Sequence, residues 1–134
     1  MIGTLKKLLS TLVAAAVLSA PAAATPRDPE AELAEALRGR VAGEPVPCLP
    51  SRQTWSTQIV DGTAILYRFG DTIYVNRPRG GADRLRKDDV LVTRSYGGQI
   101  CRPDIVTLVD RASRFQRSFV SLGDFVPYRR AETR

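Results

Sequence analysis

The stretch that decides the fold runs from one cysteine to the other, residues 48–101, and reads CLPSRQTWSTQIVDGTAILYRFGDTIYVNRPRGGADRLRKDDVLVTRSYGGQIC. It contains both cysteines of the chain. In an oxidising compartment, two cysteines in a small chain usually pair, and a pair without Cys-x-x-Cys spacing is expected to be structural rather than redox-active. We therefore predict a disulfide between Cys48 and Cys101 that closes a β domain.

Three predicted strands occupy the first half of this stretch. Their sequences alternate, or are rich in β-branched and aromatic residues, as is typical of strands. Asp61-Gly62 and Gly70-Asp71 separate them and are typical of two-residue hairpin turns. The prediction is an antiparallel meander with strands at 52–60, 63–69 and 72–76. Four aromatic residues are expected in its core or as cross-strand partners: Trp55, Tyr67, Phe69 and Tyr74.

Shorter apolar runs follow, separated by turn residues such as Gly97-Gly98, Pro103-Asp104 and Gly123-Asp124. Further strands are expected at 89–95, 99–102, 105–109, 119–122 and 125–128, with a polar break at 76–87 and a basic connection at 111–117. Six to eight short strands without an internal helix predict an all-β domain, either a small antiparallel barrel or a sandwich.

The first residues have the pattern of a secretory signal peptide. Lys6 and Lys7 precede an uncharged apolar run at 8–20, and the alanines at 22 and 24 fit cleavage after Ala24. The apolar run is shorter than the roughly 20 residues of a membrane-spanning helix. We therefore expect export to a bacterial periplasm or beyond, with no transmembrane segment in the mature chain.

A short amphipathic helix and a proline-rich linker are expected before the β domain. Asp28-Pro29 is typical of an N-cap followed by the first helical position. Leu33, Leu37 and Val41 recur every four residues and form a narrow apolar stripe. This pattern fits a helix that packs on the β domain and equally a mobile arm. The predicted segments are the signal peptide, the helix and linker, the β domain and a basic tail, at 1–24, 25–47, 48–128 and 129–134.

Charge limits the class of partner. Without the two lysines of the signal segment, 18 basic residues face 14 acidic ones, a net charge of +4, and 17 of the basic residues are arginine. Export removes nucleic acid as a partner, so anionic lipid, polysaccharide or an acidic envelope protein remains. The alternative is a solvated surface that only keeps the protein soluble.

The absence of histidine from the sequence excludes Ser-His-Asp and Cys-His catalysis and the usual imidazole metal sites, and we expect no metal or cofactor. The sequence contains neither the Gly-x-x-x-x-Gly-Lys-Ser/Thr motif nor the Gly-x-Gly-x-x-Gly motif of nucleotide-binding proteins. Asp88-Asp89 is a candidate acid pair or hard-cation ligand, but neighbours in a strand point to opposite faces. Two acids beside Arg84, Arg86 and Lys87 are instead expected to form an ion-paired turn. The remaining aspartates next to turn residues are expected to be structural, namely Asp61, Asp71, Asp104 and Asp124. No catalytic residue is assigned.

The strongest candidate site is the loop Arg77-Pro78-Arg79-Gly80-Gly81. Its two guanidinium groups can present forked donors to a carboxylate or phosphate, because proline stiffens the loop. The two glycines, Gly80 and Gly81, let backbone amides approach the same anion. The alternative is a plain solvated connection.

Four motifs in order resemble a group of small exported bacterial β-domain proteins of unknown function. The motifs are Cys48-Leu49, DGTAILY at 61–67, YVNR at 74–77 and GQICRPDI at 98–105. In that group a Cys-Leu pair opens the domain, and a Leu/Ile-Cys-x-x-Asp segment supplies the second cysteine. The resemblance covers about residues 48–110 and implies export, a β fold and a structural disulfide. It implies no activity.

Three classes of function remain open. The first is a non-enzymatic exported binding or interaction module, whose basic loop meets an anionic partner. A narrower form is an inhibitor that places this loop in the acidic cleft of a cell-wall-degrading enzyme. The second is a carboxylate-based envelope hydrolase, which needs two converging carboxylates. The third is an envelope protein held by anionic lipid through salt-sensitive attraction.

Overall fold

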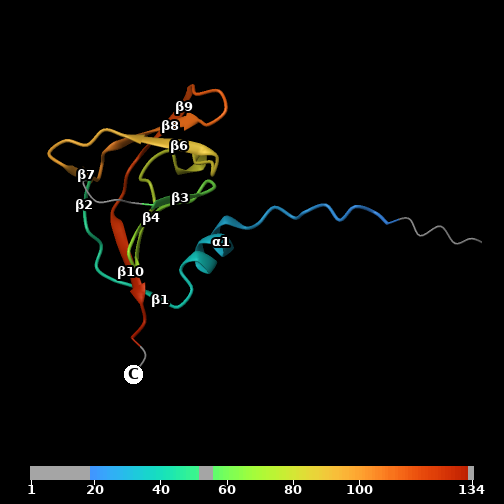
Figure 1. Ribbon diagram of the computed structural model, residues 1–134, viewed down its shortest axis with the longest axis horizontal. Helices are drawn as coiled ribbons and strands as arrows, with labels where there is room; N and C mark the ends of the chain where they lie inside the picture. The colour runs from blue at the N-terminus through green and yellow to red at the C-terminus, as the bar shows by residue number, and fades with distance from the viewer. Residues whose placement is uncertain (1–18, 52–55, 133–134) are drawn as a thin grey trace, which may run out of the picture.

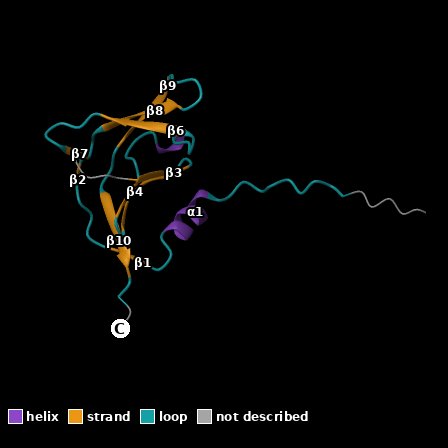
Figure 2. Ribbon diagram, in the orientation of Figure 1, coloured by secondary structure: helices purple, strands orange, loops and turns teal. Residues whose placement is uncertain are grey.

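A computed structural model of the chain describes residues 19–51 and 56–132. These residues form mostly antiparallel strands, with one short α-helix and one 3-10 turn (Figures 1 and 2). The elements in chain order are α1 (Pro29–Ala36), β1 (Arg40–Ala42), β2 (Cys48–Pro50), β3 (Ser56–Val60), β4 (Ala64–Phe69), β5 (Thr72–Asn76), η1 (Ala82–Arg84), β6 (Asp89–Thr93), β7 (Gln99–Cys101), β8 (Ile105–Asp110), β9 (Gln116–Ser121) and β10 (Phe125–Arg130).

The strands form three antiparallel sheets. A five-stranded sheet has the order β1-β10-β5-β4-β3, a three-stranded sheet has the order β6-β8-β9, and β2 and β7 form a two-stranded ribbon. The chain leaves the five-stranded sheet after β5, builds the three-stranded sheet, and returns through β10 between β1 and β5. The first and last strands therefore lie side by side.

The main core lies between the two larger sheets. It takes side chains from the five-stranded sheet, the three-stranded sheet, the ribbon and the loop between η1 and β6. Its fully buried members include Ile65, Val106, Leu108, Val120 and Phe125. The three-stranded sheet therefore packs against the five-stranded sheet; in Figure 1, β6, β8 and β9 lie at the top of the view, above β3, β4 and β10.

Helix α1 covers the other face of the five-stranded sheet. Leu33 is 3% exposed and packs in a second cluster with Val60, Leu66 and Ile73. The helix begins as expected, with Asp28 accepting a hydrogen bond from the Glu30 amide and proline at the start. Because both faces of the sheet are covered, four consecutive residues of β4 are buried.

The predicted meander is present as β3, β4 and β5, in antiparallel register. The second hairpin turn is the two-residue Gly70-Asp71, between the paired Phe69 and Thr72. The first turn is longer than predicted and spans 61–63, because Val60 pairs with Ala64. Trp55 and the predicted start of the first strand at 52 lie outside the described residues.

The sheet extends beyond the predicted β domain at both ends. The helix ends at Ala36, and Gly39 has a φ of 72° that turns the chain into β1. Val41, expected on the helix stripe, instead lies in β1 and is 60% exposed. β1 pairs with β10, so Arg129 and Arg130 belong to a strand rather than to a basic tail.

The polar break at 76–87 and the basic connection at 111–117 are more ordered than predicted. The 3-10 turn η1 lies in the first, and Leu85 after it is 2% exposed in the main core. In the second, β9 begins at Gln116, where a register irregularity interrupts its pairing with β8.

Residues 1–18 lie outside the described part of the chain, so the signal-peptide prediction is not addressed by the structure. Residues 19–28 have no regular structure and are exposed (Figure 1). In the part of the chain that the structure describes, no helix combines the length and apolarity needed to cross a membrane.

Candidate functional site

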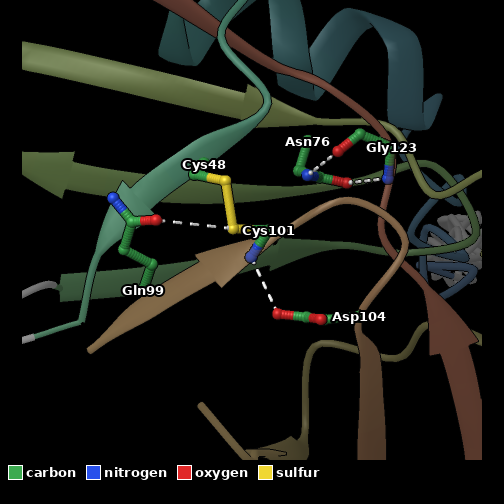
Figure 3. The surroundings of a disulfide bond; sticks show 6 residues. All are labelled: Cys48, Asn76, Gln99, Cys101, Asp104 and Gly123. Atoms are coloured by element: carbon green, nitrogen blue, oxygen red, sulfur yellow. Dashed lines mark hydrogen bonds between the residues drawn. A yellow bond between two sulfur atoms is a disulfide. The ribbon is translucent and has the colours of Figure 1, made fainter. Parts of the chain in front are cut away.

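The predicted disulfide is present and joins Cys48 of β2 to Cys101 of β7 (Figure 3). The two residues are directly opposite in the ribbon, which places Leu49 and Ile100 side by side in the main core. Asp104 accepts a hydrogen bond from the Cys101 amide through Oδ2, at 2.8 Å. The predicted structural role of Asp104 at the disulfide corner is therefore confirmed.

The structure divides the predicted anion-binding loop into two parts. Arg77 faces α1, where Nη1 and Nη2 donate to the two carboxylate oxygens of Glu30 at 2.8 and 3.0 Å. The hydrogen bonds from Arg77 lower the pKa of Glu30, and the same bonds raise the pKa of Arg77. The forked donors of Arg77 are therefore already bound by a carboxylate of the same chain.

The rest of the loop runs along β9. The Arg79 amide donates to the Ser121 carbonyl at 2.8 Å, and Gly80 forms a β-bridge with Ser121. Gly81 has a φ of 79°, and a Cβ on it would lie 2.8 Å from the Phe119 carbonyl oxygen. The close contact and the positive φ explain glycine at position 81, whereas a Cβ on Gly80 would have no neighbour within 4 Å, and the Arg79 side chain is exposed.

A buried polar pair beside this loop was not predicted. Asn76, at the end of β5, donates to the Gly123 carbonyl at 2.8 Å and accepts from the Gly123 amide at 3.0 Å (Figure 3). Asn76 is 0% exposed. A Cβ on Gly123 would lie 2.4 Å from the Arg77 carbonyl oxygen, so this position requires glycine. The only sequence signals were an asparagine that ends a strand and a glycine before an aspartate.

The two adjacent acids separate as expected for strand neighbours, but the ion pair has a different partner. Asp89 is 5% exposed, and its carboxylate binds the guanidinium of Arg117 on β9, with Nε donating to Oδ1 at 3.1 Å. Asp88 is exposed. The sequence pointed to Arg84, Arg86 or Lys87 because they are close along the chain, whereas Arg117 is brought near by sheet pairing.

The other turn aspartates have structural partners. Asp61 accepts from the Lys87 amide at 2.6 Å, and Asp124 pairs with Arg102 at 2.6 Å. Asp110 accepts from the amides of the β8–β9 turn, and the bond from Ser113 lowers its pKa. Within 19–51 and 56–132, no group of three or more histidine, cysteine, aspartate and glutamate side chains is placed to hold a metal ion.

The outer face of the three-stranded sheet, formed by β6, β8 and β9, is an apolar surface that the described elements leave uncovered. Alternate residues of β6 and β8 point away from the core, and those on this face are apolar or threonine. Val92 is 45% exposed and Ile105 is 50% exposed, and Phe119 on β9 is 49% exposed. This face points away from the five-stranded sheet and α1 (Figure 1).

A hollow of about 720 Å³ lies on this outer face. Its floor is formed by Val92, Ile105, Thr107 and Val109. At one end it is bounded by Arg94 and Tyr96, which follow β6, and at the other by Arg114 in the β8–β9 turn. The two ends of the hollow lie at opposite ends of β6 and β8. In the register of these strands, Thr93 pairs with Val106 at one end and Asp89 pairs with Asp110 at the other.

The charged side chains that line the hollow are two arginines, Arg94 and Arg114, and one carboxylate, Asp104, which is bonded to the Cys101 amide. Arg84 stacks on the ring of Phe119, 5.6 Å from its centroid, and extends the basic surface to the β9 side. Arg94 and Arg114 are exposed. The candidate site is therefore an apolar hollow with an arginine at each end, next to the predicted loop at Arg79 but distinct from it.

Comparisons of the chain with protein-family models, with curated proteins and with solved structures gave no match.

Proposed function

We propose that this chain is an exported, non-enzymatic interaction module that holds an anionic partner against the outer face of the three-stranded sheet. The single observation that carries the proposal is the hollow over Val92 and Ile105, with Arg94 at one end and Arg114 at the other. Uncovered apolar surface on a small protein is typical of an interaction site, and arginine is enriched at such sites.

The disposition of carboxylates supports a binding role over hydrolysis. Asp89 is neutralised by Arg117, Asp104 is bound to the Cys101 amide, and Asp110 caps a turn. A carboxylate hydrolase needs two such groups that converge on a substrate. Asp104 does border the hollow, but its carboxylate is engaged with the backbone.

The inhibitor form of the proposal is less favoured. It needs both arginines of the loop at 77–81 to reach into an acidic cleft. Arg77 is bonded to Glu30 through both terminal nitrogens, so it would have to leave α1 first. Without Arg77, the loop presents only the guanidinium group of Arg79, and it cannot bind an anion between two guanidinium groups.

The proposal is tested with three defined anionic probes, namely poly-L-glutamate, phosphatidylglycerol vesicles and alginate. The purified chain is expected to bind at least one of them in low salt. The double variant Arg94→Glu, Arg114→Glu should weaken that binding at least tenfold, because two attractive contacts become repulsive. Isothermal titration calorimetry provides the measurement.

The matched control is Arg27→Glu with Arg129→Glu, which makes the same change of net charge at two exposed arginines away from the three-stranded sheet. Its binding should fall much less, through overall charge alone. Equal losses in the two double variants, or no binding to any probe, would overturn the proposal. A loss caused by Arg79→Glu alone would move the site back to the predicted loop.

A further inference from the structure

We infer that the partner held in the hollow is an extended polypeptide segment with aliphatic side chains and two acidic residues, one for Arg94 and one for Arg114. This inference rests on the proposed function and names the partner class for the same face. It depends on the shape of the hollow, the spacing of its arginines and the chemistry of its floor.

The length of the hollow fits a short extended chain. Its ends are separated by the four-residue advance from Thr93 to Asp89 along β6, which is about 14 Å at the rise of a strand. An extended peptide covers that distance with about four or five residues. Acidic side chains at both ends of such a segment reach Arg94 and Arg114, and both arginines are exposed and form no ion pair within the described residues.

The floor fits the side chains of such a segment. Val92, Ile105 and Val109 present aliphatic groups between the two charged ends. A peptide that crosses them can bury aliphatic side chains on the floor and still keep its carboxylates at the ends. Burial of these side chains removes apolar surface of both partners from water and so stabilises the complex.

Other occupants fit less well. A flat lipid surface that rests on Tyr96 and the β8–β9 turn would bridge the hollow and leave its apolar floor uncontacted. A second copy that presents the same face would place arginine against arginine, which is unfavourable. Charge complementarity together with the recessed floor therefore favours an acidic polypeptide.

The test is selection from a random eight-residue peptide library displayed on phage, with the purified chain as bait. Enriched peptides should carry two acidic residues four or five positions apart, with aliphatic residues between them. A synthetic selected peptide should bind at least tenfold more weakly after both acids are changed to glutamine. The variant Arg94→Gln, Arg114→Gln should cause a similar loss, whereas Arg27→Gln, Arg129→Gln should retain affinity.

The outcomes separate this inference from the proposed function. If vesicles or alginate bind in a way that depends on Arg94 and Arg114 while no acidic peptide is enriched, the peptide inference is wrong and the proposed function stands. If enriched peptides lack paired acids, the inference is also overturned. If the binding of every anionic probe is independent of these two arginines, both the peptide inference and the proposed function are wrong. Self-association that Arg94→Gln, Arg114→Gln abolishes would assign the face to a second copy.

Discussion

Asn76 and Gly123 bind each other through two hydrogen bonds at the point where the chain returns from β9 to β10. The side-chain amide of Asn76 therefore holds in place the connection between β9 of the three-stranded sheet and β10 of the five-stranded sheet. Replacement by alanine leaves a buried backbone donor and acceptor unpaired. We expect Asn76→Ala to lower the free energy of unfolding by roughly 2–4 kcal/mol, measured by urea denaturation.

The control for this prediction is Glu44→Ala at an exposed position, which should change stability by no more than about 0.5 kcal/mol. An Asn76→Ala chain as stable as this control would show that the pair does not hold the connection.

The disulfide should be the largest single contribution to stability. Cys48 and Cys101 are separated by 53 positions, and closing a loop of this size stabilises the folded chain by about 4 kcal/mol in the chain-entropy model. The double variant Cys48→Ala, Cys101→Ala should lose about that amount in urea denaturation. Treatment of the parent chain with a reductant should give a matching loss, and a parent chain that titrates two free thiols before reduction would refute the assignment.

The ion pair between α1 and the end of β5 should respond to acid. The folded-state pKa of Glu30 lies below its ordinary value of 4.5 because of the hydrogen bonds from Arg77. A group with a lowered pKa stabilises the fold fully above its unfolded pKa and loses that effect as pH falls through the folded pKa. Stability should therefore fall more between pH 5 and 3 in the parent chain than in Glu30→Gln, compared by urea midpoints at each pH. Parallel pH profiles would show that the pair contributes nothing.

The hydroxyl of Tyr67 is buried and has no hydrogen-bond partner among the described residues. Burial raises the pKa of this phenol. The ring itself packs edge-on against Phe125, with centroids 5.5 Å apart, and this contact survives loss of the oxygen. We expect Tyr67→Phe to raise the free energy of unfolding by roughly 1 kcal/mol. A loss of similar size in thermal or chemical denaturation would reveal a partner for the hydroxyl.

The sequence predicted most strands because strands and turns follow local patterns, and it predicted the disulfide because the chain has two cysteines. Asp61-Gly62 and Gly70-Asp71 located the meander, and the two cysteines left a single pairing. β1 was missed because Val41 continues the helical spacing of Leu33 and Leu37, whereas the strand forms through its pairing with β10. Its partner lies almost ninety residues away, which no local pattern reports.

The candidate site was harder to predict, for a related reason. Arg77 and Arg79 are two residues apart in a loop and looked equivalent, yet Arg77 binds Glu30, 47 positions earlier. The apolar runs at 89–93 and 105–110 are typical of strands buried on both faces. Nothing local shows that the outer face of their sheet is uncovered, so the hollow between Arg94 and Arg114 appears only once the layers are assembled.

The central claim is that the outer face of the three-stranded sheet is where an anionic partner binds. Its most direct test is the set of amide chemical-shift changes in the ¹⁵N-labelled chain during titration with poly-L-glutamate. We predict that the changes cluster at Val92, Arg94, Ile105, Thr107 and Arg114 and that they disappear at high salt. Changes confined to Arg79–Gly81, or spread evenly over all exposed arginines, would contradict the account.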